Sequence, residues 1–310
     1  MSRAKVKFQD LVHSTIKNDG ELVGLLPVVE KEILHYDILN AMHQRGYFKH
    51  LVFQGETCLR LIYGSNRFSE DLDFVGGVDF DQSVVDGLAD TISSYLTARY
   101  GLSVRVKAPK KKESEGGVNV SAWQISIETA PERRDLPRQR IKLEIANVSA
   151  QTKTVRQLLK NYEHLPPSMT GLLVPVETPV EILADKLVSL PAVTSHIRHR
   201  DIWDIGFLVQ TYNKEAKTIS SEMIQKKIEE YGIPDFEEKL SSRIESLSEA
   251  IQSNAFDSEI RRFLPQSVLN RTLDQDGFKL FLSDTVSAAL NNVRNLLYSN
   301  QNEQQPIFRM

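Results

Sequence analysis

Two aspartates separated by one position, Asp71 and Asp73, are the residues best placed to do chemistry. On a β-strand alternate side chains share a face, so both carboxylates point the same way while Leu72 and Phe74 face a core. Two carboxylates held side by side repel each other unless a cation lies between them. Oxygen ligands of this kind suit a hard ion such as magnesium. Because turns and strand edges often carry such a pair, the metal-site hypothesis needs further residues.

A third carboxylate on a later strand completes such a site. In the segment 139–146, apolar residues alternate with Lys142 and Glu144, which therefore share the polar face. Three carboxylates from two neighbouring strands can hold two metal ions about 3.5–4 Å apart, a geometry that stabilises the attacking and leaving oxygens of phosphoryl transfer. The sequence thus predicts Asp71, Asp73 and Glu144 as ligands of two magnesium ions.

Residues upstream of the aspartates are placed to hold phosphate groups. Gly55 lies between a predicted strand and a predicted helix, where backbone N–H groups and the helix dipole favour an anion. Arg67 and Ser69 come just before the aspartates, within reach of phosphate oxygens. Positioning and charge neutralisation supply most of the catalysis in nucleotidyl transfer, so this set of residues is chemically sufficient for it.

The elements that must position these residues divide the chain into two parts. The first part alternates strands with helices, and the second is helical. Strands are predicted at 50–54, 71–75, 102–108, 118–129 and 139–146, with helices at 28–45, 57–63 and 82–100. Later helices are predicted at 154–160, 178–190, 200–212, 219–231, 236–252, 256–264 and 273–298. We expect an α/β (α+β) core with a mixed sheet over 1–150 and a helical C-terminal domain over 151–310.

Composition narrows the class of protein without revealing a function. Of the 310 residues, 41% are hydrophobic and 25% are charged, as in ordinary globular proteins. The net charge of -3 gives no global basic field, so any nucleic-acid surface must be local. The single cysteine, Cys58, excludes an internal disulfide. Without a signal-like N-terminus or an apolar run of about 20 residues, we expect a cytoplasmic protein without membrane contact.

Several sequence blocks occur in the order of a known family. They read GETCLR at 55–60, YG at 63–64, RFSEDLDF at 67–74, KLEI at 142–145, PVEILADKL at 179–187 and RDIWDI at 200–205. The stretch from about residue 30 to 210 resembles the AbiEii/AbiGii toxin-type nucleotidyltransferases, a branch of the polymerase-β-like nucleotidyltransferase superfamily. The resemblance implies the nucleotidyltransferase fold.

The resemblance assigns roles to further residues. It implies that Thr57 joins the phosphate-binding residues named above, and that Lys186 contacts the phosphates of an NTP. Asp204 would orient Lys186 or lie on the acceptor side, which makes both residues catalytic together with the three carboxylates. Without the resemblance, Lys186 reads as a solvated lysine and Asp201 as a charge at a helix N-terminus.

One position departs from the family pattern. The second glycine of the family's phosphate-binding loop is Glu56 in this chain. An acid in that loop repels a triphosphate unless its side chain turns away. A non-catalytic protein that binds nucleotide or RNA therefore remains an alternative.

The resemblance also implies a biological role. It implies a magnesium-dependent toxin of a type IV toxin–antitoxin or phage-defence pair, restrained by a cognate antitoxin. Such a toxin transfers a nucleoside monophosphate from an NTP to an acceptor, expected to be the 3′ end of a tRNA, and releases pyrophosphate. A protein hydroxyl and a small molecule are the alternative acceptors.

Basic residues offer a local surface for such an acceptor. Candidates for RNA contact are Lys110, Lys111, Lys112, Arg133, Arg134, Arg198 and Arg200. Arg198 and Arg200 are favoured because they lie at the start of the predicted helix that carries Asp204. The alternative is that these charges are merely solvated.

Overall fold

The computed structural model describes residues 7–17, 20–109, 118–133, 136–163 and 165–299. Residue contacts divide the chain into an α/β unit, which ends at Glu177 but includes Phe263–Ser267, and a helical unit formed by Thr178–Arg262 and the residues from Val268. The mixed α/β fold is therefore confirmed. The predicted RNA contacts Lys110, Lys111, Lys112 and Arg134 lie outside the described residues.

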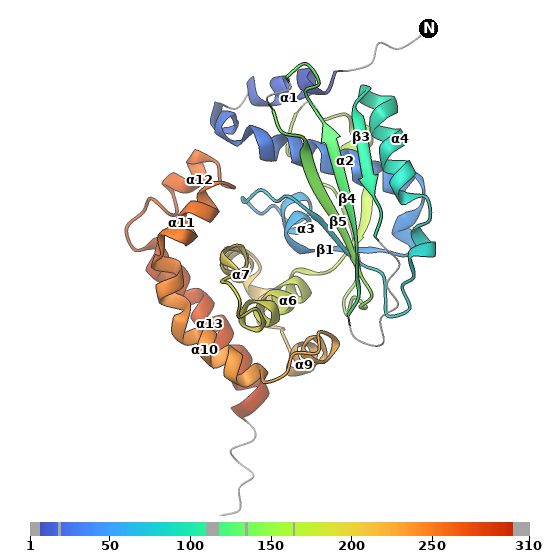
Figure 1. Cartoon of the computed structure of the whole chain (residues 1–310). Helices are drawn as coiled ribbons and strands as arrows, with labels where there is room; N and C mark the ends of the chain where they lie inside the picture. Colours follow the sequence, from blue (N-terminus) through green and yellow to red (C-terminus); the bar gives the residue numbers. More distant parts are fainter. Residues whose placement is uncertain (1–6, 18–19, 110–117, 134–135, 164, 300–310) are drawn as a thin grey trace, which may run out of the picture. The chain divides into compact units, whose positions relative to one another are not determined.

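A seven-stranded mixed sheet forms the centre of the α/β unit (Figure 1). Its order is β3-β4-β5-β2-β1-β7-β6. The strands are β1 (Val52–Gln54), β2 (Leu72–Val75), β3 (Ser103–Lys107), β4 (Val120–Glu128), β5 (Gln139–Ala146), β6 (Thr154–Gln157) and β7 (Leu173–Val176). β2 runs parallel to β5 and β1 runs parallel to β7, while the other neighbours are antiparallel. The strand of the paired aspartates thus lies between β5 and β1, inside the sheet.

Aromatic and aliphatic side chains hold β2 in the core. Leu72 is fully buried, and Phe74 stacks on Phe53 at 5.1 Å and on Phe48 at 6.2 Å between ring centroids. The helices of this unit are α1 (Phe8–Lys17), η1 (Gly20–Leu25), α2 (Leu26–Gln44), η2 (Tyr47–Lys49), α3 (Gly55–Leu61), η3 (Gln82–Val85), α4 (Leu88–Tyr100) and α5 (Pro167–Thr170). Helix α2 contacts both α4 and the sheet, and α3 packs against β2.

The prediction of a helix at 154–160 is wrong. Residues Thr154–Gln157 form the edge strand β6, which pairs antiparallel with β7. β7 in turn pairs with β1, so the sheet continues beyond residue 150 and the contact boundary falls at Glu177. A four-residue edge strand is too short for hydrophobic periodicity to distinguish it from a helical turn.

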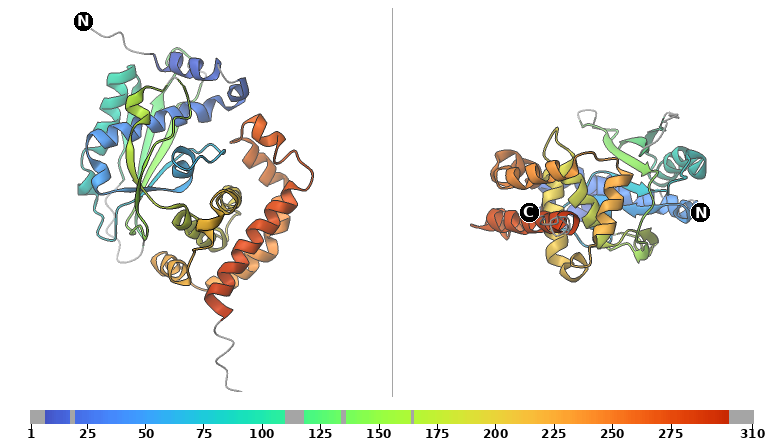
Figure 2. Two further views of the ribbon diagram at one scale, coloured as in Figure 1. Left: turned by 180° about the vertical axis from the view of Figure 1, so that it is seen from behind. Right: turned by 90° about the horizontal axis from the view of Figure 1, so that it is seen from below.

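The helical unit is built around α6 and α7. Its helices are α6 (Pro179–Ala192), α7 (His199–Thr211), α8 (Asn213–Ala216), α9 (Ser221–Glu230), α10 (Phe236–Gln252), α11 (Asn254–Arg261) and α13 (Phe278–Tyr298), while α12 (Gln266–Asn270) straddles the boundary between the units. Helices α10 and α13 lie side by side, as Figure 2 shows. A Cβ atom at Gly206 of α7 would lie 2.4 Å from Leu282, so glycine permits the close approach of α7 to α13. No helix among the described residues is long and apolar enough to cross a membrane.

A buried carboxyl in the α/β unit makes its stability depend on pH. Burial raises the pKa of Asp37 to about 7, although Arg99 Nε lies 3.1 Å from its Oδ1 and the Tyr100 hydroxyl donates to its Oδ2 at 2.7 Å. Because the folded-state pKa lies above the unfolded-state value, the unfolded chain loses this proton first. The group therefore lowers stability as the pH rises towards 7.

We expect Asp37→Asn to remove this pH dependence. The difference between the unfolding free energies of the variant and the wild type should grow in favour of the variant by on the order of 2–3 kcal/mol from pH 5 to pH 8. Urea unfolding at the two pH values measures the change. The matched variant Asp79→Asn, at an exposed position of the same unit, should show a constant difference from the wild type. A constant difference for Asp37→Asn would contradict the prediction.

Candidate active site

The pairing of β2 with β5 brings the three predicted metal ligands to adjoining positions. Asp73 lies opposite Glu144 in the parallel register, and Asp71 directly precedes β2. The Asp71 Oδ1 atom accepts the backbone N–H of Lys142 at 2.9 Å. Leu72 and its partner on β5 are fully buried, whereas the carboxylates are half-buried. The three acids therefore project from one face of the sheet.

A lysine offsets part of the negative charge on this face. Lys142 Nζ lies 3.1 Å from Glu144 Oε2. Burial raises the pKa of Asp71, and the Lys142 N–H and ammonium offset only part of this effect. In the part of the chain that the structure describes, Asp71, Asp73 and Glu144 do not form a set whose ligand atoms all lie within 4.8 Å of one another. Glu144 instead contacts the Lys142 ammonium. The three carboxylates thus already have one positive charge beside them.

Gly55 is required where the first turn of α3 meets the aspartates. Its φ of +77° lies in the left-handed region, which favours glycine. A Cβ atom there would lie 2.8 Å from Asp73 Oδ2 and 3.2 Å from Asp73 Cβ. The backbone of Gly55 thus covers Asp73 at a distance that a larger residue does not allow.

We expect Gly55→Ala to displace Asp73 and to strain the backbone. The left-handed conformation costs a non-glycine residue about 1–2 kcal/mol, and relief of the contact must move the carboxylate. We predict a fall in nucleotidyl transfer of on the order of 10²-fold, together with a small loss of thermal stability. Gly101→Ala is the control, because Gly101 also has a positive φ but has open space around its Cβ position. Equal activity of the two variants would contradict the prediction.

Three predicted phosphate contacts are buried in the structure. Thr57, Arg67 and Ser69 are each less than 5% exposed. The Thr57 hydroxyl lies 2.9 Å from Ser69 Oγ and also contacts the backbone carbonyl oxygen of Asp71. These side chains brace the backbone that enters β2. Their contact with a triphosphate stays a prediction.

Glu56, the departure from the family pattern, pairs with Arg67. Glu56 Oε2 lies 3.1 Å from Arg67 Nη2, and Arg67 Nη1 donates to the carbonyl oxygen of Phe68 at 3.0 Å. The acid therefore meets a buried guanidinium, which offsets its negative charge. This ion pair offsets the charge of Glu56, and nucleotide binding stays a prediction.

Side chains from α2 and α3 fix the turn before Asp71, and sequence reasoning did not identify them as part of the site. Lys31 Nζ lies 2.5 Å from Glu70 Oε1, and His35 Nε2 lies 3.1 Å from the Glu70 carbonyl oxygen. Arg60 donates to the carbonyl oxygen of Ser65 at 3.0 Å. Arg60 belongs to the GETCLR block, so the family resemblance could have pointed to it. Lys31 and His35 on α2 carry no such signal, because they are distant in sequence from the residues that they contact.

In the helical unit, Lys186 of α6 is buried against two aspartates of α7. Its Nζ lies 2.8 Å from Asp201 Oδ1 and 2.9 Å from Asp204 Oδ2. Burial alone would raise the pKa of Asp201, but Lys186 and Arg198 hold it well below its usual range. Lys186 is thus a fixed, ion-paired ammonium, and the interpretation as a solvated lysine is wrong. Lys186 also contacts Asp204, and an orienting role of that aspartate stays a prediction.

A family model matches most of the chain. The family described as nucleotidyl transferase AbiEii toxin, type IV toxin–antitoxin system, matches residues 37–292. The chain belongs to this family. It is thus a nucleotidyltransferase toxin of a type IV system, which implies an NTP substrate and an antitoxin partner.

Solved structures share the fold of the toxin. MenT4, a nucleotidyltransferase toxin from Mycobacterium tuberculosis, is 17% identical with a TM-score of 0.52, and the match covers 92% of this chain and 98% of that chain. JHP933 from Helicobacter pylori is 20% identical with a TM-score of 0.51, and that match covers 90% and 98% of the two chains. No curated protein matches the toxin.

The toxin's predicted acceptor residues in the helical unit are ion-paired. Arg198 Nε contacts Asp201 Oδ2, and Arg200 Nε lies 3.3 Å from Glu259 Oε1. Glu259 also lies 3.0 Å from His199 Nδ1. The Arg198 side chain is 40% exposed and the Arg200 side chain is 33% exposed. An RNA phosphate would compete with these carboxylates for the guanidinium groups.

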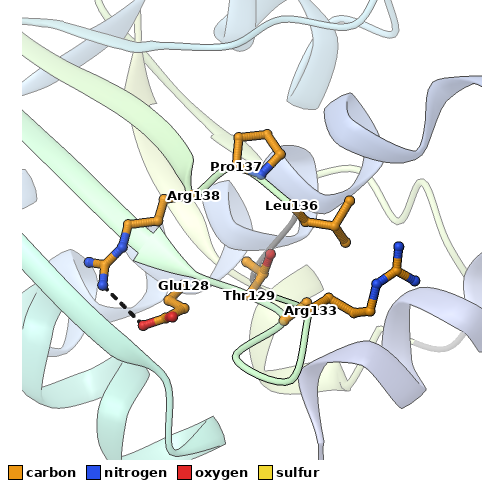
Figure 3. A pocket seen from close by; sticks show the side chains of 7 residues that line it. Glu128, Thr129, Arg133, Leu136, Pro137 and Arg138 are labelled. Atoms are coloured by element: carbon orange, nitrogen blue, oxygen red, sulfur yellow. Dashed lines mark hydrogen bonds and ion pairs between the residues drawn. The ribbon is translucent and has the colours of Figure 1, made fainter.

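A pocket of about 350 Å³ follows β4 in the α/β unit of the toxin. Figure 3 shows Arg133 and Arg138 at this pocket, with Arg138 joined to Glu128 at 3.0 Å. Thr129, Ala130, Leu136 and Pro137 complete the lining. The predicted acceptor contact Arg133 is therefore exposed beside a hollow surface, where a phosphate group can approach it.

Proposed function

We propose that the toxin transfers a nucleoside monophosphate from an NTP to the 3′ end of a tRNA and releases pyrophosphate. The observation that carries the proposal is the parallel register that places Asp73 opposite Glu144, with Asp71 one step before the same strand. Acids from two neighbouring strands on one face are the arrangement that metal-assisted phosphoryl transfer requires.

Asp71, Asp73 and Glu144 would hold two magnesium ions. The ligand set suits this ion because it offers only carboxylate oxygens and already attracts the Lys142 ammonium as a cation. Bound magnesium supplies charge neutralisation for the attacking and leaving oxygens. Gly55 keeps space above the Asp73 carboxylate, and the Thr57 hydroxyl fixes the backbone of Asp71. These residues hold the acids in place before substrate binds.

The phosphate groups need positive charge from the chain as well. We assign Lys186 to the phosphates of the NTP, together with Gly55, Thr57, Arg67 and Ser69, as the family resemblance implies. Asp204 would orient the Lys186 ammonium, which it contacts at 2.9 Å. An acceptor hydroxyl releases its proton to solvent and attacks the α-phosphate, a new P–O bond forms as the bond from the α-phosphorus to the β-phosphate oxygen breaks, and pyrophosphate leaves.

RNA is the proposed acceptor because each unit carries exposed or half-buried arginines, although the chain as a whole has a net charge of -3. The exposed Arg133 and the half-buried pair Arg198 and Arg200 provide such charge. Counterion release from RNA phosphates would then make binding strongly salt-dependent. A role in phage defence under antitoxin control belongs to the same proposal.

Labelled nucleotide transfer tests the proposal. The toxin is incubated separately with each α-labelled NTP, total RNA and lysate proteins, with magnesium or with EDTA, and RNA 3′ ends are sequenced. Label on tRNA 3′ ends in the magnesium arm alone is the expected result. Label in protein but not in RNA would overturn the acceptor, and equal label in EDTA would overturn the metal requirement.

A further inference from the structure

A lysine lies directly beside the carboxylates of the proposed metal site. Lys142 precedes Glu144 by two positions on β5, so both side chains project from the same face. Its Nζ lies 3.1 Å from Glu144 Oε2, and its backbone N–H donates to Asp71 Oδ1 at 2.9 Å. Lys142 thus contacts two of the three proposed ligands, one through its side chain and one through its backbone.

The charges around Lys142 show what its ammonium does. The Lys142 ammonium forms an ion pair with Glu144, and Asp71 and Asp73 lie at adjoining positions on the same face. Three acids at adjoining positions would repel one another without it. Lys142 supplies the positive charge that a bound cation would otherwise supply.

We propose that Lys142 is a built-in counter-ion that sets how tightly this site binds a divalent metal ion. In the metal-free toxin it holds Glu144, and a metal ion must take the Glu144 oxygen from it. The proposal rests on the proposed function, because it takes Asp71, Asp73 and Glu144 as metal ligands. Competition for Glu144 and repulsion between the two cations both weaken metal binding.

The consequence is a link between metal binding and NTP binding. A triphosphate carries several negative charges, and magnesium in such sites shares its coordination between carboxylates and phosphates. Those charges offset the repulsion between Lys142 and the metal ion. The NTP therefore strengthens metal binding, and by linkage the metal strengthens NTP binding by the same factor.

Calorimetric titration with MgCl₂ or MnCl₂ alone tests the proposal on the intact toxin. Lys142→Gln should bind the metal about three- to tenfold more tightly, a modest factor because the lysine side chain is 44% exposed. Lys142→Arg keeps the charge and should stay within about twofold of the wild type. Unchanged or weaker binding by Lys142→Gln would overturn the proposal.

Lys107→Gln is the matched control. Lys107 pairs with Gln124 across β3 and β4, and Gln124 pairs with Lys142 across β4 and β5. Lys107 therefore lies on the same face about 10 Å away, beyond the Debye length at physiological salt. Its substitution should leave metal affinity unchanged. An increase as large as that of Lys142→Gln would show a general charge effect and overturn the specific role of Lys142.

Two further measurements separate the proposal from its alternatives. Without metal, Lys142→Gln should unfold at a lower temperature than the wild type, and saturating metal should remove the difference. An equal loss with and without metal, at unchanged metal affinity, would indicate a purely structural lysine and overturn the proposal. Glu144→Gln tests the proposed function itself. If Glu144→Gln leaves metal binding unchanged, the proposed metal site is wrong. If Glu144→Gln weakens metal binding but Lys142→Gln does not change it, only the role proposed for Lys142 is wrong.

Discussion

A toxin that carries Asp71→Asn or Asp73→Asn is expected to lose nucleotidyl transfer by about 10³-fold or more while its fold becomes no less stable. The activity falls because an amide does not provide the anionic oxygens that bind magnesium. Stability is maintained because the substitution removes a like charge from a face where burial already raises the pKa of Asp71. Incorporation of labelled nucleotide and thermal unfolding without metal measure the two effects.

The combination of lost activity and retained stability distinguishes a functional acid from a structural one. An acid that served the fold would lower the unfolding temperature when replaced, because it would leave a partner unpaired. Asp79→Asn is the matched control, since Asp79 is exposed on the same unit and should keep both activity and stability. If Asp71→Asn and Asp73→Asn retained more than about a tenth of the activity, neither acid would hold a catalytic metal ion.

Long periodic segments of this fold could be predicted from the sequence, whereas short ones could not. The predicted strand 139–146 and helix 236–252 coincide with β5 and α10, because alternation and helical periodicity extend over whole elements there. The edge strand β6 has four residues and was predicted as a helix. Its identity depends on β7, which lies more than ten residues later and gives no local signal.

The site shows the same division. Alternation along each strand was enough to place Asp71 and Asp73 on one face, but their pairing with Glu144 is set by contacts between residues about 70 positions apart. The partner of Glu56 was equally hidden, because Arg67 lies in an irregular turn without a period. Sequence patterns therefore identify candidate groups, and long-range pairing decides which groups meet.

Lys186→Met is expected to have the second large effect, on both stability and activity. The side chain of Lys186 is 6% exposed, and those of Asp201 and Asp204 are each 1% exposed. Loss of one partner from a buried ion-paired group typically costs about 3–5 kcal/mol, because the remaining charges stay buried. The loss should be smaller at acidic pH, since Lys186 holds the pKa of Asp201 low and without it this carboxyl becomes easier to protonate. Urea unfolding at pH 5 and pH 8 measures this difference.

A double variant separates the structural from the catalytic role of Lys186. In Lys186→Met/Asp204→Leu both members of one buried pair are apolar, and Asp201 keeps Arg198 and the Ser189 hydroxyl as partners. Stability should therefore recover by at least about half of the loss in Lys186→Met. Nucleotidyl transfer should nevertheless stay at least about 10²-fold below that of the wild type, because the ammonium assigned to the NTP phosphates is still missing. Recovery of activity together with stability would show that Lys186 acts only through the packing of α6 against α7.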